Sequence, residues 1–317
     1  MVMNDLMVEV QGLKKRFGNT EALRGINLSV AAGSVLGVLG PNGAGKTTTI
    51  NCLTTLIKPD AGKAAIAGYD IIRDPASVRA LISVTGQFAA VDEELTAREN
   101  LILFGRLLRL SHHDAAKRAT ELLEQFDLMA AGNRRVKEFS GGMRRRLDLA
   151  ASIVAEPLVL FLDEPTTGLD PRSRQQLWDV VRELKQRGIT IFLTTQYLEE
   201  ADELADRIVV IDRGEAIAEG TADELKDRIG GTYCEIRLAD PRDEAKVRQE
   251  LGELHQCPAD GTLALPAPDR VATLIDVVRR MDAIGVTLAD ISLRRPSLDD
   301  VFFELTGHTT EDANTKS

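Results

Sequence analysis

The sequence lacks any apolar run long enough to cross a membrane. None of its 317 residues falls in a stretch that approaches the ~18 to 20 apolar residues of a membrane-spanning helix. The longest apolar runs, such as residues 158–162 and 208–211, have the length of buried strands. The N-terminus also lacks the charged-then-apolar pattern of a secretory signal. If the protein works at a membrane, we therefore expect it to dock onto another protein that spans it.

Cysteine is scarce and scattered. The three cysteines, Cys52, Cys234 and Cys257, match no metal-binding spacing, and an odd number argues against a disulfide framework. We interpret them as reduced cytosolic thiols that serve as small apolar residues.

Positive charge is in deficit. The chain has 39 Lys and Arg against 49 Asp and Glu, so its formal net charge is -10. A protein whose main task is to hold nucleic acid needs a broad basic face, and this balance argues against one. It does not exclude a small local anion site.

The pattern that is present is one of short apolar runs alternating with amphipathic helices. Buried strands are predicted at residues 35–39, 158–162, 190–193 and 208–211. Ser111, with Asp114 three residues later, predicts the start of a helix. The alternation indicates an α/β domain with a mainly parallel core sheet. Shorter strands, expected at residues 7–11, 28–30 and 64–67, suggest an antiparallel sheet beside it.

A break near Gly230 and Gly231 divides the chain. We predict one domain over residues 1–230 and a small α+β accessory domain over residues 231–308. The accessory domain is expected to hold strands near 233–238, 262–265 and 291–293 and helices near 244–251, 274–284 and 298–305. The polar tail, residues 309–317, is expected to be disordered.

A glycine-rich loop follows the first predicted core strand. Glycines let backbone N–H groups turn toward a phosphate, and the helix that follows points its N-terminus at the anion. Lys46 would bring positive charge to the β- and γ-phosphates, and Thr47 would offer its hydroxyl to Mg²⁺. The predicted phosphate-binding residues are Gly40, Pro41, Asn42, Gly43, Ala44, Gly45, Lys46, Thr47 and Thr48.

Two carboxylates end the apolar run at residues 158–162. They are expected at the carboxyl edge of the sheet, where ligands bind in open α/β folds. Asp163 is predicted to hold Mg²⁺, directly or through water, and Glu164 to align or deprotonate the attacking water.

The stretch Phe139-Ser140-Gly141-Gly142-Met143-Arg144-Arg145-Arg146 predicts a second anion site at a helix start. In this arrangement the chain resembles ATP-binding-cassette (ABC) ATPases over residues 7 to about 225, with Ser140, Gly141 and Gly142 in the place of the signature motif. Phe139 and Met143 depart from its usual Leu and Gln. The arginine run could suggest nucleic acid, but we interpret it as a solvated helix face.

The resemblance assigns further roles. Phe17 matches the aromatic that stacks on adenine, Gln87 the glutamine that reaches Mg²⁺, and Asp170 the aspartate of the loop after the carboxylate pair. Gln196 stands where the family usually has a histidine that contacts the γ-phosphate. Its amide can still donate a hydrogen bond but cannot become cationic. We expect hydrolysis to survive, because Glu164 is intact, but at a reduced rate.

The resemblance also implies partners. In this family ATP binds between two cassettes, each phosphate loop facing the other's signature motif, so one motif of each kind implies a homodimer or a pairing with a second cassette. The segments at residues 84–87, 139–146, 194–202 and 295–302 resemble the daunorubicin-resistance type of exporter ATPase. That type implies separate integral membrane subunits, a peripheral place on the cytoplasmic face of the membrane, and export of hydrophobic drugs, antibiotics or lipids.

Residues 298–305 resemble that type's terminal motif, which is thought to stabilise the ATPase dimer or its contact with the membrane subunit. The alternative is a simple helix that closes the small domain. A soluble ABC ATPase of translation or DNA maintenance is the competing class. It is disfavoured by the single cassette and by the absence of long coiled-coil insertions. A third class is a nucleotide-dependent scaffold that does not hydrolyse ATP.

Overall fold

The computed structural model describes residues 6–86, 90–228, 232–252, 254–256 and 262–306. These residues form two compact units, the first ending at Thr221 and the second beginning at Ala222. The boundary predicted from the sequence, at the glycine pair, lies nine residues later. The difference is helix α8 (Ala222–Arg228), which packs against α11 (Leu298–Thr306) in the second unit.

The first unit is built on a parallel sheet with the strand order β10-β9-β3-β8-β7-β6. Only the pairing of β10 with β9 is antiparallel, so the prediction of a mainly parallel core sheet is confirmed. Its strands are β3 (Val35–Leu39), β6 (Ile82–Thr85), β7 (Val159–Asp163), β8 (Thr190–Thr195), β9 (Arg207–Asp212) and β10 (Glu215–Gly220).

An antiparallel sheet with the order β2-β1-β4-β5 lies beside the parallel one, as predicted. Two of its strands are much longer than the apolar runs indicated, because bulges keep them paired through polar residues. The strands are β1 (Leu6–Phe17), β2 (Thr20–Ala31), β4 (Ala61–Ile66) and β5 (Tyr69–Asp70).

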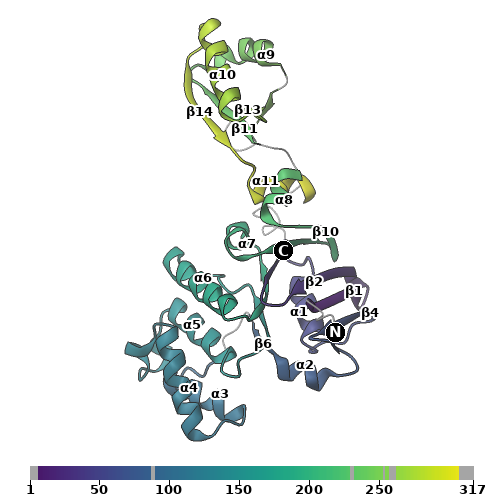
Figure 1. The fold of residues 1–317 in the computed structure, drawn as a ribbon, viewed down its shortest axis with the longest axis vertical. Helices are drawn as coiled ribbons and strands as arrows, with labels where there is room; N and C mark the ends of the chain where they lie inside the picture. The colour runs from purple at the N-terminus through teal and green to yellow at the C-terminus, as the bar shows by residue number, and fades with distance from the viewer. Residues whose placement is uncertain (1–5, 87–89, 229–231, 253, 257–261, 307–317) are drawn as a thin grey trace. The chain divides into compact units, whose positions relative to one another are not determined.

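The central parallel strands β3, β7 and β8 are buried on both faces, which explains their largely apolar sequences. Alternate residues of one strand enter two different cores: Leu160 and Leu162 pack among the helices α3 to α6, whereas Phe161 packs with the antiparallel sheet and α1. Figure 1 shows these two layers on opposite sides of the sheet. The helices are α1 (Lys46–Leu53), α2 (Pro75–Leu81), α3 (Ala97–Leu107), α4 (His112–Gln125), α5 (Gly141–Ser152), α6 (Pro171–Gln186) and α7 (Leu198–Leu204), with 3₁₀ turns η1 (Met129–Ala131) and η2 (Val136–Glu138).

The second unit is a small α+β structure with its own core. Its antiparallel sheet has the order β12-β13-β11-β14 and packs through residues such as Ile236 and Leu263 against Val277 and Met281 of α10. Ser297 caps α11 through reciprocal hydrogen bonds with Asp300. The elements between α8 and α11 are β11 (Tyr233–Leu238), η3 (Pro241–Asp243), α9 (Glu244–Leu251), β12 (His255–Gln256), β13 (Leu263–Pro266), α10 (Val271–Ala283) and β14 (Leu288–Arg294). The predicted tail lies outside the described residues.

Candidate functional site

The glycine-rich loop joins the end of β3 to the first residue of α1. Gly45 has φ 111°, and a Cβ there would lie 2.8 Å from the carbonyl oxygen of Ala22. Because an L side chain rarely adopts this backbone conformation and has no room here, glycine is required at this position. The tight turn aims the first N–H groups of α1 back into the loop, which suits an anion.

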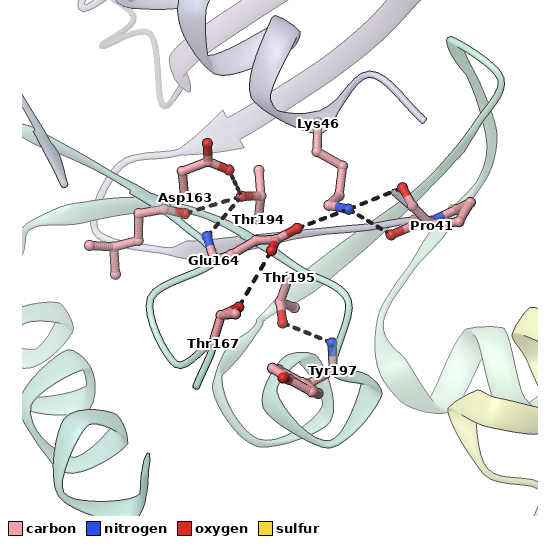
Figure 2. Close-up of polar contacts among 10 residues, drawn as sticks. Pro41, Lys46, Asp163, Glu164, Thr167, Thr194, Thr195 and Tyr197 are labelled. Carbon is pink, nitrogen blue, oxygen red and sulfur yellow. Dashed lines mark hydrogen bonds and ion pairs between the residues drawn. The ribbon is translucent and has the colours of Figure 1, made fainter. Parts of the chain in front are cut away.

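Lys46 lies inside the loop that precedes it. Its Nζ donates hydrogen bonds to the carbonyl oxygens of Gly40 at 2.8 Å and Pro41 at 3.1 Å. The same nitrogen lies 3.2 Å from Glu164 Oε1, and the two side chains are only 4% and 9% exposed. Figure 2 shows the ammonium group between the loop and this carboxylate. A buried cation is therefore held by groups that an incoming phosphate could replace.

The two carboxylates sit at the carboxyl end of β7, as the sequence predicted. Thr194 of the neighbouring strand β8 donates its hydroxyl to Asp163 Oδ1 at 2.5 Å (Figure 2). The carbonyl of Thr194 accepts from the Glu164 N–H at 3.0 Å. Glu164 has φ 48°, a left-handed conformation that costs about 1 to 3 kcal/mol outside glycine. The surrounding hydrogen bonds hold it there, and Thr167 adds a contact to Oε2 at 3.4 Å.

The structure brings much of the predicted phosphate site together around one cavity. Its volume is about 170 Å³. The lining residues are Ala22, Asn42, Gly43, Gly45, Lys46, Thr47, Thr48 and Glu164. Ala22 is the member that sequence reasoning missed; it comes from β2 and has no chemical signature of its own. The lining residues include hydroxyl side chains, the ammonium group of Lys46 and the carboxylate of Glu164.

Two other predicted residues lie at the ends of strands. Phe17 ends β1 with its side chain 48% exposed, and Lys15 Nζ lies 5.5 Å from the ring centroid. An exposed ring next to a cation can stack on a planar base. Gln196 follows the last residue of β8 and is partly buried. Gln87 lies outside the described residues, directly after Gly86.

The predicted signature residues form a separate group at the start of α5. Ser140 caps this helix by accepting a hydrogen bond from the Met143 N–H at 3.3 Å. Asp170 caps α6 in the same way, accepting from the N–H and hydroxyl of Ser173, and these bonds hold the pKa of its carboxyl below its usual value. Ser140, Gly141 and Gly142 do not line the cavity around Lys46.

The arginine run at residues 144–146 was predicted to be a solvated helix face, and two of its members are not. Arg145 and Arg146 are not on a solvated face, since their side chains are only 11% exposed. Arg146 donates to the carbonyl of Phe126, and Arg145 reaches the loop after β7. The aspartate three residues after Arg145 was the signal that could have revealed this, because an i, i+3 pair shares one helix face.

The described residues show two absences. No helix among them combines the length and apolar character that a bilayer crossing requires. In the same part of the chain, no group of three or more His, Cys, Asp or Glu side chains is arranged to hold a metal ion by itself.

Comparison with known proteins agrees with this geometry. The ABC transporter family model matches residues 23–167. The doxorubicin resistance ATP-binding protein DrrA of Mycobacterium tuberculosis is 53% identical over 97% of this chain and 96% of its own. The daunorubicin resistance ATP-binding protein DrrA2 of Streptomyces coeruleorubidus is 53% identical over 99% of each chain.

The fold has also been solved in related cassettes. A dimeric ATP-binding cassette in a post-hydrolysis state, bound to ADP and phosphate, is 26% identical, with a TM-score of 0.62 over 68% of this chain and 98% of the other. This likeness covers 68% of the chain, whereas the two resistance proteins match over 97% and 99% of it. Because the two resistance proteins match it over nearly its whole length, the chain belongs to the ABC transporter family, as an ATP-binding protein of the daunorubicin- and doxorubicin-resistance type.

Proposed function

We propose that this chain binds MgATP at residues 40–48 and hydrolyses it to power export through separate membrane subunits. The observation that carries the proposal is the buried pair of Lys46 and Glu164, 3.2 Å apart at the mouth of the glycine-rich turn. A cation that can bind phosphate and a carboxylate that can act on water therefore line the same cavity, in contact with each other.

Binding follows from the groups around the loop. The N–H groups at the start of α1 and the Lys46 ammonium group receive the β- and γ-phosphates. Lys46 then exchanges its contact with Glu164 for phosphate oxygens, which releases the carboxylate. Phe17 stacks on the adenine.

The oxygen donors present suit Mg²⁺. This ion prefers oxygen ligands and is usually held by one or two carboxylates together with substrate phosphates. Thr47 and the buried carboxylate of Asp163 supply such donors, and Thr194 fixes one Asp163 oxygen at 2.5 Å. Gln87 is proposed as a third ligand. When bound, Mg²⁺ neutralises charge that develops on the phosphate oxygens.

Hydrolysis requires a positioned water. Glu164 accepts a proton as the water oxygen attacks the γ-phosphorus and the bond to the ADP oxygen breaks, giving ADP and phosphate. Gln196 donates its amide N–H to the γ-phosphate. Because this side chain has no titratable group, it contributes the same charge at every pH.

Two chains complete the site. Ser140 and Gly141 are exposed and Gly142 is buried, and none of the three lines the cavity around Lys46 of its own chain. The related solved cassette is dimeric with ADP and phosphate bound. We therefore place these residues, with Asp170, against the ATP held by a second copy or a second cassette. An isologous dimer would contain two such sites.

The relatives suggest the cargo and the place of work. Their names refer to resistance to doxorubicin and daunorubicin. We accordingly propose export of hydrophobic drugs, antibiotics or lipids, with the chain held at the cytoplasmic face by integral membrane subunits. No nucleic acid is involved.

Lys46→Ala and Glu164→Gln test the two halves of the proposal. Losing charge-assisted phosphate contacts should weaken ATP binding of Lys46→Ala by roughly 10- to 100-fold. Glu164→Gln should bind ATP normally, lose about 10²- to 10⁴-fold in kcat, and accumulate ATP-bound dimers. Nucleotide titration, phosphate release and size-exclusion chromatography measure these effects.

The opposite results are equally clear. Normal ATP affinity in Lys46→Ala would refute the role given to that lysine. A fully active Glu164→Gln would remove Glu164 from the reaction. Transport that continues unchanged while Glu164→Gln traps ATP would indicate a nucleotide-dependent scaffold instead.

A further inference from the structure

Arg145 and Asp148 lie one turn apart on α5 and are both largely withdrawn from solvent. Their side chains are 11% and 4% exposed, and Arg145 Nη1 lies 3.5 Å from Asp148 Oδ2. Burial lowers the pKa of the arginine and raises that of the aspartate, and each partly offsets the effect on the other. A buried charge pair of this kind needs additional hydrogen bonds to be retained.

The hydrogen bonds of Arg145 converge on the segment that carries the catalytic carboxylate. Its Nε donates to the carbonyl of Pro165 at 2.8 Å, and Nη2 reaches the carbonyl of Asp163 at 3.5 Å. These two carbonyls stand immediately before and after Glu164. Arg145 therefore contacts the backbone on both sides of a residue held in a left-handed conformation.

The same pair holds two further points of the backbone. Arg145 Nη1 donates to the carbonyl of Gly86 at 2.7 Å, and Asp148 Oδ1 accepts from the N–H of Ala90 at 2.7 Å. Gly86 directly precedes Gln87 in the sequence. One guanidinium group thus links α5 to two strand ends, those of β6 and β7.

We infer that Arg145, oriented by Asp148, is a positioning residue that holds Glu164 in the geometry needed to activate water. This rests on the proposed function, in which Glu164 accepts the proton. It also joins two sites: α5 begins at the residues proposed to meet the partner's ATP, and Arg145 on that helix contacts the backbone around its own chain's Glu164.

The planar shape of the Arg145 side chain allows it to reach several carbonyl groups at once. A guanidinium group presents several donors in a fixed plane, whereas an ammonium group is a single nitrogen. Lysine at this position keeps the charge but cannot reach the carbonyls of Gly86, Asp163 and Pro165 together. Asparagine in place of Asp148 keeps an acceptor for Ala90 but removes the charge that faces Arg145.

The experiment compares Arg145→Lys with Arg118→Lys in the purified full-length chain. Arg118 is similarly buried, with 14% of its side chain exposed, and also donates to a backbone carbonyl, that of Ile153 at 3.1 Å. We expect Arg145→Lys to lower kcat at least tenfold, with the Kd for ATP and the KM for MgATP within about twofold of wild type. Arg118→Lys should keep the wild-type kcat.

Thermal unfolding of each variant separates positioning from simple stability. If Arg145→Lys lowers Tm but keeps the wild-type kcat per folded molecule, the inference is overturned. If it does not fold at the assay temperature, Asp148→Asn decides: a reduced kcat at unchanged ATP affinity supports the inference, and a wild-type kcat refutes it.

Wild-type protein and Glu164→Gln set the upper and lower limits of the assay. If wild type hydrolyses ATP and Arg145→Lys does so equally well, only the inference about Arg145 fails. If wild type does not hydrolyse ATP, the proposed function itself fails, and the inference fails with it.

Discussion

Gln196 is a neutral hydrogen-bond donor on one side of the proposed γ-phosphate site. It follows directly on β8, whose Thr194 and Thr195 are fully buried and are fixed by hydrogen bonds to Asp163 and to the Tyr197 N–H. The backbone before Gln196 is therefore rigid, and the side chain extends from an anchored position. An amide there supplies a donor without a titratable proton.

Gln196→Ala should lower kcat by roughly 100-fold, as is typical when one donor to developing charge is removed. ATP affinity should change little, because Lys46 and the loop remain. Gln196→His should retain activity, and its rate relative to wild type should rise as the pH falls through about 6.5, since only imidazolium adds positive charge. Steady-state phosphate release between pH 6 and 8 measures both effects; a wild-type kcat in Gln196→Ala would exclude the contact.

For single residues, the sequence predicted the groups that carry the chemistry better than the residues that hold those groups in place. Lys46, Asp163 and Glu164 carry unmistakable functional groups next to strand ends, and the structure places them where expected. Thr194 and Arg145 were missed, because their importance comes from the neighbouring strand and the neighbouring loop. Such contacts depend on tertiary packing and leave only faint local patterns, such as the threonine pair that ends β8.

Helices α5 and α6 meet where their N-terminal residues face each other. A Cβ added at Gly142 would lie 2.3 Å from Ser173 Oγ and 2.7 Å from Ser173 Cβ, and Ser173 in turn bonds to Asp170. Gly141, one residue earlier, has nothing within 4 Å of that position. Gly142 therefore allows α5 to pack against α6, whereas Gly141 leaves open space at the start of α5.

Gly142→Ala and Gly141→Ala exploit this contrast. Overpacking should reduce the free energy of unfolding of Gly142→Ala by about 1 to 3 kcal/mol, whereas Gly141→Ala should stay within about 0.5 kcal/mol of wild type. If a partner's ATP approaches Gly141, that variant should nevertheless lose hydrolysis. Denaturant unfolding and phosphate release report the two effects. A Gly141→Ala protein that is both stable and fully active would contradict the placement of ATP there.

Elements with a strong period were predictable, and their extents were less so. The core strands follow from continuous apolar runs, and α9 and β11 were predicted with the bounds that the structure shows. The β1–β2 hairpin was not predicted at full length. Its outer halves, such as Lys14 to Arg16, are polar and are held by backbone pairing across bulges, which hydrophobic periodicity does not detect.

At the scale of the whole molecule, the residues proposed for the nucleotide site all belong to one of the two units. Every residue proposed to contact ATP, from Phe17 to Gln196, lies in the first unit, whereas the second has its own hydrophobic core. The sequence predicts two parts with a boundary at the glycine pair. The helix that precedes those glycines belongs to the second unit because it packs on α11, whose residues lie at least 70 positions away.

Helix α11 has one buried face and one exposed apolar face. Leu298, Val301 and Phe302 are buried, whereas Phe303 and Leu305 are 41% and 39% exposed. The two readings of this terminal helix, one that closes the small unit and one that contacts another subunit, can therefore be tested on different side chains.

Deleting residues 296–317 should weaken assembly with a second cassette or the membrane subunit and leave ATP affinity within about twofold, because the nucleotide site lies in the other unit. The deletion also removes the buried face of α11, so it changes both roles at once. Phe303→Ser with Leu305→Ser keeps the three buried side chains and removes only the exposed apolar pair. If α11 contacts another subunit, the double variant should reproduce the assembly defect in co-purification with its membrane partner while Tm stays near wild type. If it assembles normally and only the deletion fails, α11 serves to close the small unit.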